Sequence, residues 1–299
     1  MQSSTFQLQR IQRRNGCLTT LFFVMFGLFV TPIFLCGLSL VAYLLFPPPH
    51  VDILVMGLDS RAGQGMVSRS DSIMLVGIDP ALLRVSILSI PRDLHIEAPA
   101  YGLQPVNTIN MLGEMAQPGS GTALLSASIA QNFGVRPERY IRLDFKAFVE
   151  LVDTVGGITV YVDRMIVDDA YPAEDGEIAS VRFESGLQYM DGERALVYAR
   201  TRHADDDYRR AERQQQVLSA LASRLANPLN WPRVWNVLNS QIDTNITLWD
   251  MAMLAPPVLL NTGRFEQLVI DRDFVVGTAE GYAAPNYERI IPWLQGRFD

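Results

Sequence analysis

The chain opens with one long apolar run. Residues 17–46 contain no charged side chain; Arg10, Arg13 and Arg14 precede them, and Pro-Pro-Pro-His follows at 47–50. A bilayer core of about 30 Å is crossed by about 20 helical residues, so the run is long enough to span it. Because positive charge is retained on the cytoplasmic side, the flanks predict an N-terminus inside the cell. We therefore expect a short cytoplasmic tail (1–16), a transmembrane signal anchor (17–46), a proline-rich spacer (47–50) and an extracytoplasmic domain (51–299).

The alternative interpretation of this run is a secretory signal that is cleaved. The apolar segment is then roughly twice the usual length of about 7–15 residues, and no small-residue cleavage site follows it. The pattern favours an uncleaved anchor in the cell membrane.

Beyond residue 50, short apolar runs alternate with segments of helical periodicity. Buried strands are predicted at 51–57, 72–78, 85–90 and 158–162, with another near 265–270. Helices are predicted at 122–133, 145–155 and 207–226, and near 248–260 and 287–294. Asp79-Pro80 supplies a turn between the second and third strands. No linker-like stretch interrupts 51–299, so a single mixed α/β domain is expected.

Composition excludes several classes of protein. The formal net charge is −7, and the part beyond residue 50 carries 22 basic and 32 acidic groups, a net of −10. Such an acidic body does not favour binding to nucleic acid. Cys17 and Cys36 both lie in the apolar run, so the domain beyond it holds no disulfide and no cysteine-ligated metal. With Lys146 as the single lysine and three histidines in all, phosphate-loop and H-E-x-x-H motifs are missing.

Three charged residues stand at the ends of predicted strands. Asp59 follows the first strand, Asp71 precedes the second and Arg92 follows the third. If these strands form an antiparallel meander, all three positions lie at the same end of the sheet. Two carboxylates and a guanidinium there are suited to a hard cation and a phosphate group. The alternative is that both aspartates merely shape turns.

Arginines gather a second time between residues 200 and 213. Arg200 and Arg202 project from one face if residues 195–202 are extended. In the helix that follows, Arg210 and Gln214 share a narrow sector with apolar residues at 217 and 221, and therefore lie on the face that the helix buries. A buried guanidinium needs an anionic partner, so Arg210 is a candidate ligand for phosphate, with a salt bridge to Asp207 or Glu212 as the alternative.

Arg209 and Arg213 lie outside that sector and are expected on a solvated helix face. Acids at one sheet edge and arginines converging from elsewhere together predict a pyrophosphate site, since arginine binds phosphate bidentately and stays charged.

These residues also carry a resemblance to a known family. GLDSRAGQGMVSRSDSIMLVGIDP (57–80), SIPRD (89–93), TIN (108–110), FKAFVELVDTVGGITVYV (145–162), GLQYMDGERALVYARTRH (186–203) and DYRRAERQQQ (207–216) occur in the order found in the LytR-CpsA-Psr family. The sequence therefore resembles that family from about residue 51 to about residue 224, and more weakly to the C-terminus.

The resemblance implies a fold and an activity. The fold is α/β, an α/β/α arrangement around a mixed central sheet, preceded by one N-terminal transmembrane helix. The activity is that of a membrane-anchored phosphotransferase outside the cytoplasmic membrane. It moves a phosphate-linked glycopolymer from a polyprenyl-pyrophosphate carrier to a peptidoglycan acceptor, with Mg²⁺ or, as its alternative, Mn²⁺.

By motif, the resemblance gives each candidate residue a role. Asp59 and Asp71 would hold the metal. The pyrophosphate contacts would come from Arg92, Arg200, Arg202, Arg210 and Gln214. Catalysis would rest on Asp59, Asp71, Arg92, Arg200 and Arg202.

Two departures from the family pattern concern the substrate. Thr108 stands where the family usually has lysine, and Pro118-Gly119-Ser120-Gly121 replaces a Gly-Gly pair. Both bear on the details of substrate binding more than on the type of reaction.

The expected reaction is attack by a sugar hydroxyl on the sugar-linked phosphorus, with Asp59 and Asp93 as alternative bases. The carrier's tail needs an apolar pocket. One helical stripe that fits it consists of Phe145, Phe148, Val152 and Val155, for which ordinary core packing is the alternative. Two other functions stay open: a pyrophosphatase of polyprenyl-pyrophosphate lipids, and a non-catalytic envelope regulator that binds such lipids.

Overall fold

The structure is a computed structural model of the whole chain. It describes residues 4–59, 67–172, 178–201, 207–261, 264–278 and 281–298. Two compact units are present, residues 1–48 and 49–299.

The first unit is a single helix, α1 (Ser4–Leu45). Its segment Phe23–Leu45 has a mean hydropathy of 2.3 and is long and apolar enough to cross a membrane by length and composition. The helix begins before the apolar run that predicted it and includes the arginines at 10, 13 and 14.

The second unit is built on a six-stranded mixed sheet with the order β11-β6-β1-β2-β3-β12. Its strands are β1 (Val51–Leu58), β2 (Ser70–Asp79), β3 (Arg84–Ile90), β6 (Arg139–Asp144), β11 (Asp243–Thr244) and β12 (Glu266–Val269). The first three form the antiparallel meander considered from the sequence. β6 runs parallel to β1 and β12 runs parallel to β3, which makes the sheet mixed.

Side chains alternate between the two faces of this sheet. On one face Leu54 and Met56 pack under helices α2 (Val106–Ala116), α3 (Gly121–Phe133) and α9 (Tyr287–Leu294). On the other face Ile53 and Val55 pack against α8 (Leu248–Leu260). This period of two buries both faces of the central strands.

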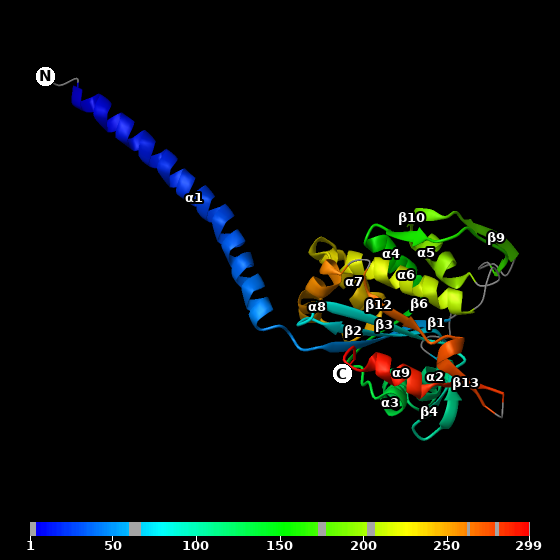
Figure 1. The fold of residues 1–299 in the computed structure, drawn as a ribbon. Coiled ribbons are helices and arrows are strands. Elements are labelled where there is room, and N and C mark those ends of the chain that lie inside the picture. Colours follow the sequence, from blue (N-terminus) through cyan, green and yellow to red (C-terminus); the bar gives the residue numbers. More distant parts are fainter. Residues whose placement is uncertain are drawn as a thin grey trace. The chain divides into compact units, whose positions relative to one another are not determined.

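Further helices complete the second layer: α4 (Phe145–Thr154), α5 (Gly192–Arg200), α6 (Asp207–Leu225) and α7 (Trp231–Gln241). They enclose a second core around Val152, Tyr198 and Val234. Figure 1 shows α4 to α8 on one side of the sheet and α2, α3 and α9 on the other. The α/β/α arrangement around a mixed sheet that the resemblance implied is confirmed.

Shorter elements connect these layers. Four two-stranded ribbons pair β4 (His95–Ala98) with β5 (Gly102–Pro105), β7 (Ile158–Val162) with β10 (Gly186–Met190), β8 (Ile166–Pro172) with β9 (Ile178–Phe183), and β13 (Val275–Gly277) with β14 (Ala283–Pro285). Two single-turn 3₁₀ helices are η1 (Pro228–Asn230) and η2 (Arg272–Phe274).

One local expectation is wrong. An extended segment at 195–202 was the condition for Arg200 and Arg202 to share a face, but α5 is helical from Gly192 to Arg200. Asp191 begins this helix, because its carboxylate accepts the backbone N–H of Arg194 at 2.9 Å and so satisfies an N-terminal donor.

A buried ion network ties the sheet to the layer of α2 and α3. Arg142 of β6 is 4% exposed. Its Nη1 donates to Glu114 Oε1 at 2.5 Å and to Asn110 Oδ1 at 3.0 Å, and its Nε donates to Asp243 Oδ2 at 2.8 Å. These acceptors are carboxylate and amide oxygens, which compensate the guanidinium for the loss of its hydration.

The same glutamate orders the loop at 118–121 that departs from the family pattern. Glu114 accepts the backbone N–H of Gly119 at 2.7 Å and that of Gly121 at 3.1 Å. A Cβ at Gly121 would lie 2.5 Å from the Asn110 carbonyl oxygen, so the packing there requires glycine. Burial alone would raise the pKa of Glu114, but hydrogen bonds from Arg142, Gly119 and Gly121 hold the pKa below its usual 4.5.

We predict that Glu114→Gln lowers the free energy of unfolding at pH 7 by about 1–3 kcal/mol, because it removes the buried one of the two carboxylates that pair with Arg142 and leaves Asp243 as the other. Urea unfolding measures this value. The pKa of Glu114 is lower in the folded state than in the unfolded state. The stabilisation by its ionised carboxylate is therefore complete above the unfolded-state pKa and is lost as the pH falls through the folded-state pKa. The difference between wild type and variant should therefore shrink in acid.

The matched control is Glu184→Gln. The pair between Arg182 and Glu184 is exposed, at 62% and 64%, so its loss should cost only about 0–1 kcal/mol. Equal losses in the two variants would contradict a stabilising role for the buried network.

Candidate functional site

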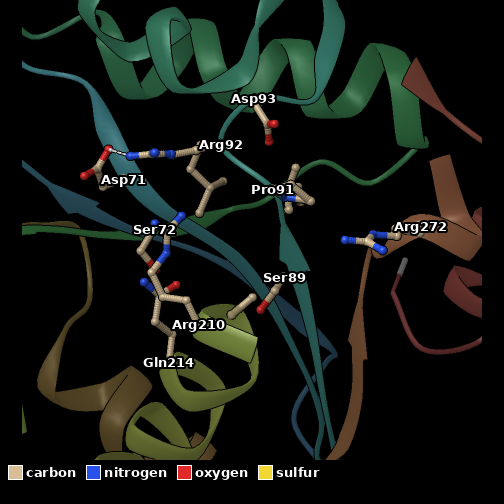
Figure 2. Close-up of a pocket in the computed structure, with 12 residues that line it drawn as sticks. Asp71, Ser72, Ser89, Pro91, Arg92, Asp93, Arg210, Gln214 and Arg272 are labelled. Carbon is tan, nitrogen blue, oxygen red and sulfur yellow. Dashed lines mark hydrogen bonds and ion pairs between the residues drawn. The ribbon is translucent and has the colours of Figure 1, made fainter. Parts of the chain in front are cut away.

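A pocket of about 280 Å³ opens at the sheet edge where β2 begins and β3 ends. Figure 2 shows its walls, which come from four segments far apart in the sequence. The lining residues are Asp71, Ser72, Ile73, Ser89, Ile90, Pro91, Arg92, Asp93, Arg210, Ala211, Gln214 and Arg272. The pocket therefore unites Asp71, Arg92, Arg210 and Gln214, four of the residues singled out from the sequence.

A β-bulge positions Asp71. Gly57 pairs with Ser72 and Leu58 pairs with Ser70, so Asp71 is the extra residue of β2 at this point of the ladder. Bulges bend a strand and re-aim side chains, and they are frequent beside active sites. The Asp71 carboxylate lies 3.2 Å from Nη1 of Arg92, with both side chains about a third exposed or less, at 32% and 27%. The pair spans β2 and the turn after β3 (Figure 2).

The backbone of Arg92 is held by the turn that follows β3. The Asn107 N–H donates to the Arg92 carbonyl at 3.1 Å, and the Leu94 N–H donates to the Pro91 carbonyl at 3.1 Å. The start of α2 thus fixes the segment that carries this guanidinium.

Asp59 lies one residue beyond β1. Its N–H donates to the Arg69 carbonyl at 3.1 Å, and its carbonyl accepts the Ser68 hydroxyl at 2.6 Å. It therefore stands at the same sheet edge as Asp71, as the meander predicts, although it is not among the residues that line the pocket.

The face of α6 that carries Arg210 is buried, as its periodicity predicts. Arg210 is 9% exposed, and Val217 and Leu221 on the same face are 2% and 4% exposed within the core. The N-terminal part of this face borders the pocket, where Arg210 and Gln214 lie on the wall opposite Arg92 (Figure 2). The Gln214 amide also donates to the Ala199 carbonyl at 3.4 Å.

The expectation for Arg213 is wrong. It is not on a solvated face but only 4% exposed. Its Nε donates to the Tyr198 carbonyl at 3.2 Å and its Nη2 donates to the Thr201 carbonyl. The physical reason is that α5 covers this side of α6, and the last carbonyls of a helix lack partners within it. Arg209, in contrast, is exposed and pairs with Glu212 at 2.8 Å, as expected.

Arg200 lies among aromatic rings. Its guanidinium carbon is 4.3 Å from the ring centre of Phe145 and 5.8 Å from that of Tyr171, and Nη1 donates to the Tyr171 hydroxyl at 3.4 Å. This contact of a cation with aromatic faces orients the guanidinium without cancelling its charge. Arg200 is not among the pocket-lining residues, and Arg202 lies outside the described residues.

The stripe proposed for the lipid tail is divided between two environments. Val152 and Val155 are 0% and 6% exposed in the second core, and Phe148 packs against that core. Phe145 begins α4 and holds Arg200. Ordinary core packing, the alternative considered from the sequence, describes the two valines.

One residue that lines the pocket and one that lies beneath it were not singled out from the sequence. Arg272, on η2, comes from the region beyond residue 230 in which the sequence shows no recognisable chemistry. Gln215, 2% exposed, donates to the Ser89 hydroxyl and to the Leu268 carbonyl, both at 2.9 Å, and so ties α6 to β3 and β12 below the pocket. The available signals were an arginine after a short apolar strand and the middle position of the Gln-Gln-Gln run at 214–216.

Carboxylates are the potential metal ligands here. Asp71 and Asp93 line the pocket and Asp59 stands at the same edge. Among the residues that the structure describes, no three His, Cys, Asp or Glu side chains cluster as a complete metal site. Two carboxylates suit a hard cation that keeps some of its water ligands and takes further oxygen ligands from a phosphate. Mg²⁺ is usually coordinated in this way.

Comparisons with known proteins agree with this architecture. The LytR_cpsA_psr family profile matches residues 49–286. The regulatory protein MsrR of Staphylococcus aureus (strain COL) is 31% identical over 202 residues, which cover 66% of this chain and 56% of that protein. The polyisoprenyl-teichoic acid–peptidoglycan teichoic acid transferase TagV of Bacillus subtilis (strain 168) is also 31% identical over 202 residues, 66% of this chain and 50% of that one. The matches thus span little more than half the length of these curated relatives.

Solved structures share the fold. The crystal structure of B. subtilis TagV superposes with a TM-score of 0.65 at 24% identity, covering 83% of this chain and 96% of that one. A structure of TagT bound to LIIa-WTA gives a TM-score of 0.64 at 22% identity, covering 84% and 91%. With the family profile matched over most of its length, this chain belongs to the LytR-CpsA-Psr family.

Proposed function

We propose that the protein is a transferase that moves a phosphate-linked glycopolymer from a polyprenyl-pyrophosphate carrier to peptidoglycan. The observation that carries the proposal is the pocket that brings Arg92, Arg210 and Gln214 together. The carboxylate of Asp71, on β2, lines the same pocket and contacts Arg92. Guanidinium groups bind diphosphate oxygens bidentately and cannot lose their charge. The name of the relative TagV, a teichoic acid transferase, agrees with this substrate class.

In the proposed reaction, the oxygen of a sugar hydroxyl on the acceptor attacks the sugar-linked phosphorus. The bond from that phosphorus to the bridging oxygen breaks, and polyprenyl phosphate leaves with the electron pair. Arg92 and Arg210 stabilise the charge that grows on the leaving phosphate, and Arg200 adds to the positive potential from beside Phe145. The hydroxyl proton passes to a carboxylate, with Asp59 and Asp93 as the candidates.

Mg²⁺ is the proposed cofactor, with Asp59 and Asp71 as its ligands and Mn²⁺ as a substitute. The oxygen-only donor set supports this choice. When bound, the cation would neutralise phosphate charge as the bond to the leaving group breaks. Asp71 also contacts Arg92, so the carboxylate orients the guanidinium as well.

For the membrane topology we propose a single-pass anchor with a cytoplasmic N-terminus and residues 51–299 outside the cytoplasmic membrane. The length and hydropathy of Phe23–Leu45 support an anchor. The arginines at 10, 13 and 14, together with their absence from the spacer, support the orientation.

Turnover tests the reaction. Full-length protein supplied with a lipid-linked pyrophosphate glycan and peptidoglycan should release polyprenyl phosphate and label the acceptor. Arg92→Ala and Arg210→Ala should each lower kcat about a hundredfold, since each removes a donor to the charge that develops in the transition state. Arg233→Ala, an exposed arginine on α7 that does not line the pocket, is the control.

The products also separate the alternative functions. Release of lipid phosphate without acceptor labelling would indicate a pyrophosphatase. Tight binding with no turnover would favour a regulator, the function named for the relative MsrR. Full activity in both pocket variants would refute the assignment of the site.

Removal of metal tests the cofactor. Chelation with EDTA should abolish turnover, and added Mg²⁺ or Mn²⁺ should restore it. Asp71→Asn should raise the Mg²⁺ concentration needed for half-maximal rate, because it removes one charged ligand. A rate that is unchanged by EDTA would contradict the metal assignment and leave the guanidinium site untouched.

Mass and protease accessibility test the topology. Protein extracted from membranes should keep residues 1–46, and protease added to intact spheroplasts should degrade the domain at 51–299. A soluble product that starts after residue 46 would instead indicate a cleaved secretory signal.

A further inference from the structure

Arg272 reaches the pocket through strand pairing. β12 runs parallel to β3, with Val269 opposite Ser89. Arg272 and Arg92 each follow three residues after these partners, so parallel pairing brings both to the same edge of the sheet. The Ile270 N–H donates to the Ser89 carbonyl at 3.1 Å and extends the register by one step toward the pocket.

The turn that carries Arg272 is fixed on both sides. The Asp271 carboxylate accepts the Asp273 N–H at 2.9 Å, and Arg289 Nη1 donates to the Asp273 carbonyl at 3.0 Å. The Asn286 N–H donates to the Phe274 carbonyl at 2.9 Å. A long side chain on an anchored backbone loses less freedom when it binds a ligand than one on a loose loop.

Arg272 contributes to the positive charge of the pocket. The pocket is lined by three arginines (Arg92, Arg210 and Arg272) and two aspartates (Asp71 and Asp93), so its net charge is +1 and becomes zero without Arg272. In Figure 2 the Arg272 guanidinium points from the η2 wall toward the side of the pocket where Ser89, Pro91 and Asp93 lie. It thus faces the cavity from the wall opposite Asp71.

We propose that Arg272 is a diphosphate-contacting residue, the third guanidinium of the site, contributed by the C-terminal segment. It binds oxygens of the diphosphate that Arg92 and Arg210 do not reach, from the side of Asp93. The inference rests on the proposed function and extends its site to η2. Because Arg272 is exposed, its replacement should leave the fold intact.

Calorimetry with inorganic pyrophosphate and with farnesyl diphosphate, in Mg²⁺ and detergent, tests the inference on the full chain. Arg272→Gln should weaken binding of both ligands by at least about tenfold, the loss expected for a charged hydrogen bond to phosphate. Arg272→Lys should recover part of the affinity, since it keeps the charge but not the two-pronged geometry. The affinity of the Arg272→Gln variant for both diphosphates should also depend less on salt concentration than that of the wild type.

Arg233→Gln removes the same charge from an exposed position outside the pocket and is the matched control. If Arg272→Gln binds as well as this control while Arg92→Gln loses affinity, Arg272 is not a contact and the inference fails, although the proposed function stands. If wild type binds neither diphosphate and shows no turnover, the proposed function fails and the inference with it. An effect of Arg272→Gln on pyrophosphate and lipid diphosphate alike supports it.

Discussion

The pairing of β3 with two different neighbours determines where the charges of the pocket lie. β2 is antiparallel to β3, so the start of β2 stands beside the end of β3 and Asp71 meets Arg92. β12 is parallel to β3, so the end of β12 leads Arg272 to the same edge. The contact between Asp71 and Arg92 could not form in another register, because a slip of one residue turns every side chain to the opposite face. The hydrophobic alternation that buries Leu54 and Ile53 on opposite faces therefore also sets the site.

The helical wall of the pocket is held by hydrogen bonds between α6 and the end of α5. α6 carries Arg210 at the pocket, and its next turn is fastened to the end of α5, where Arg213 and Gln214 donate to the carbonyls of Tyr198, Ala199 and the capping residue Thr201. The last carbonyls of a helix lack partners within it as a rule, and the guanidinium of Arg213 needs acceptors once it is buried. The carbonyls at the end of α5 and the guanidinium of Arg213 thus act as hydrogen-bond partners for each other. Gln215 also donates to Ser89 of β3 and to Leu268 of β12, so α6 is joined to the sheet as well.

The sequence could predict those parts of the fold that depend on local pattern. The meander of 51–57, 72–78 and 85–90 follows from short apolar runs, and the buried face of 207–226 follows from helical periodicity. The helix at 192–200 was missed, although Asp191 and Gly192 offer a recognisable helix start, because the apolar pattern there is weak. The position of Arg272 could not be inferred, since a four-residue strand gives no indication of its neighbour or direction. Strand order depends on contacts between distant segments.

Burial alone does not distinguish a functional arginine from a structural one. Arg142 and Arg213 are each 4% exposed, and both donate to oxygens of the protein itself: carboxylate and amide oxygens accept from the first, and backbone carbonyls are among the acceptors of the second. Arg92 keeps 27% of its side chain exposed, and Arg272 stands at the rim. A guanidinium on a buried helix face can therefore reach a ligand only where a cavity opens on that face. On α6, Arg210 lines the pocket and Arg213, three residues later, does not.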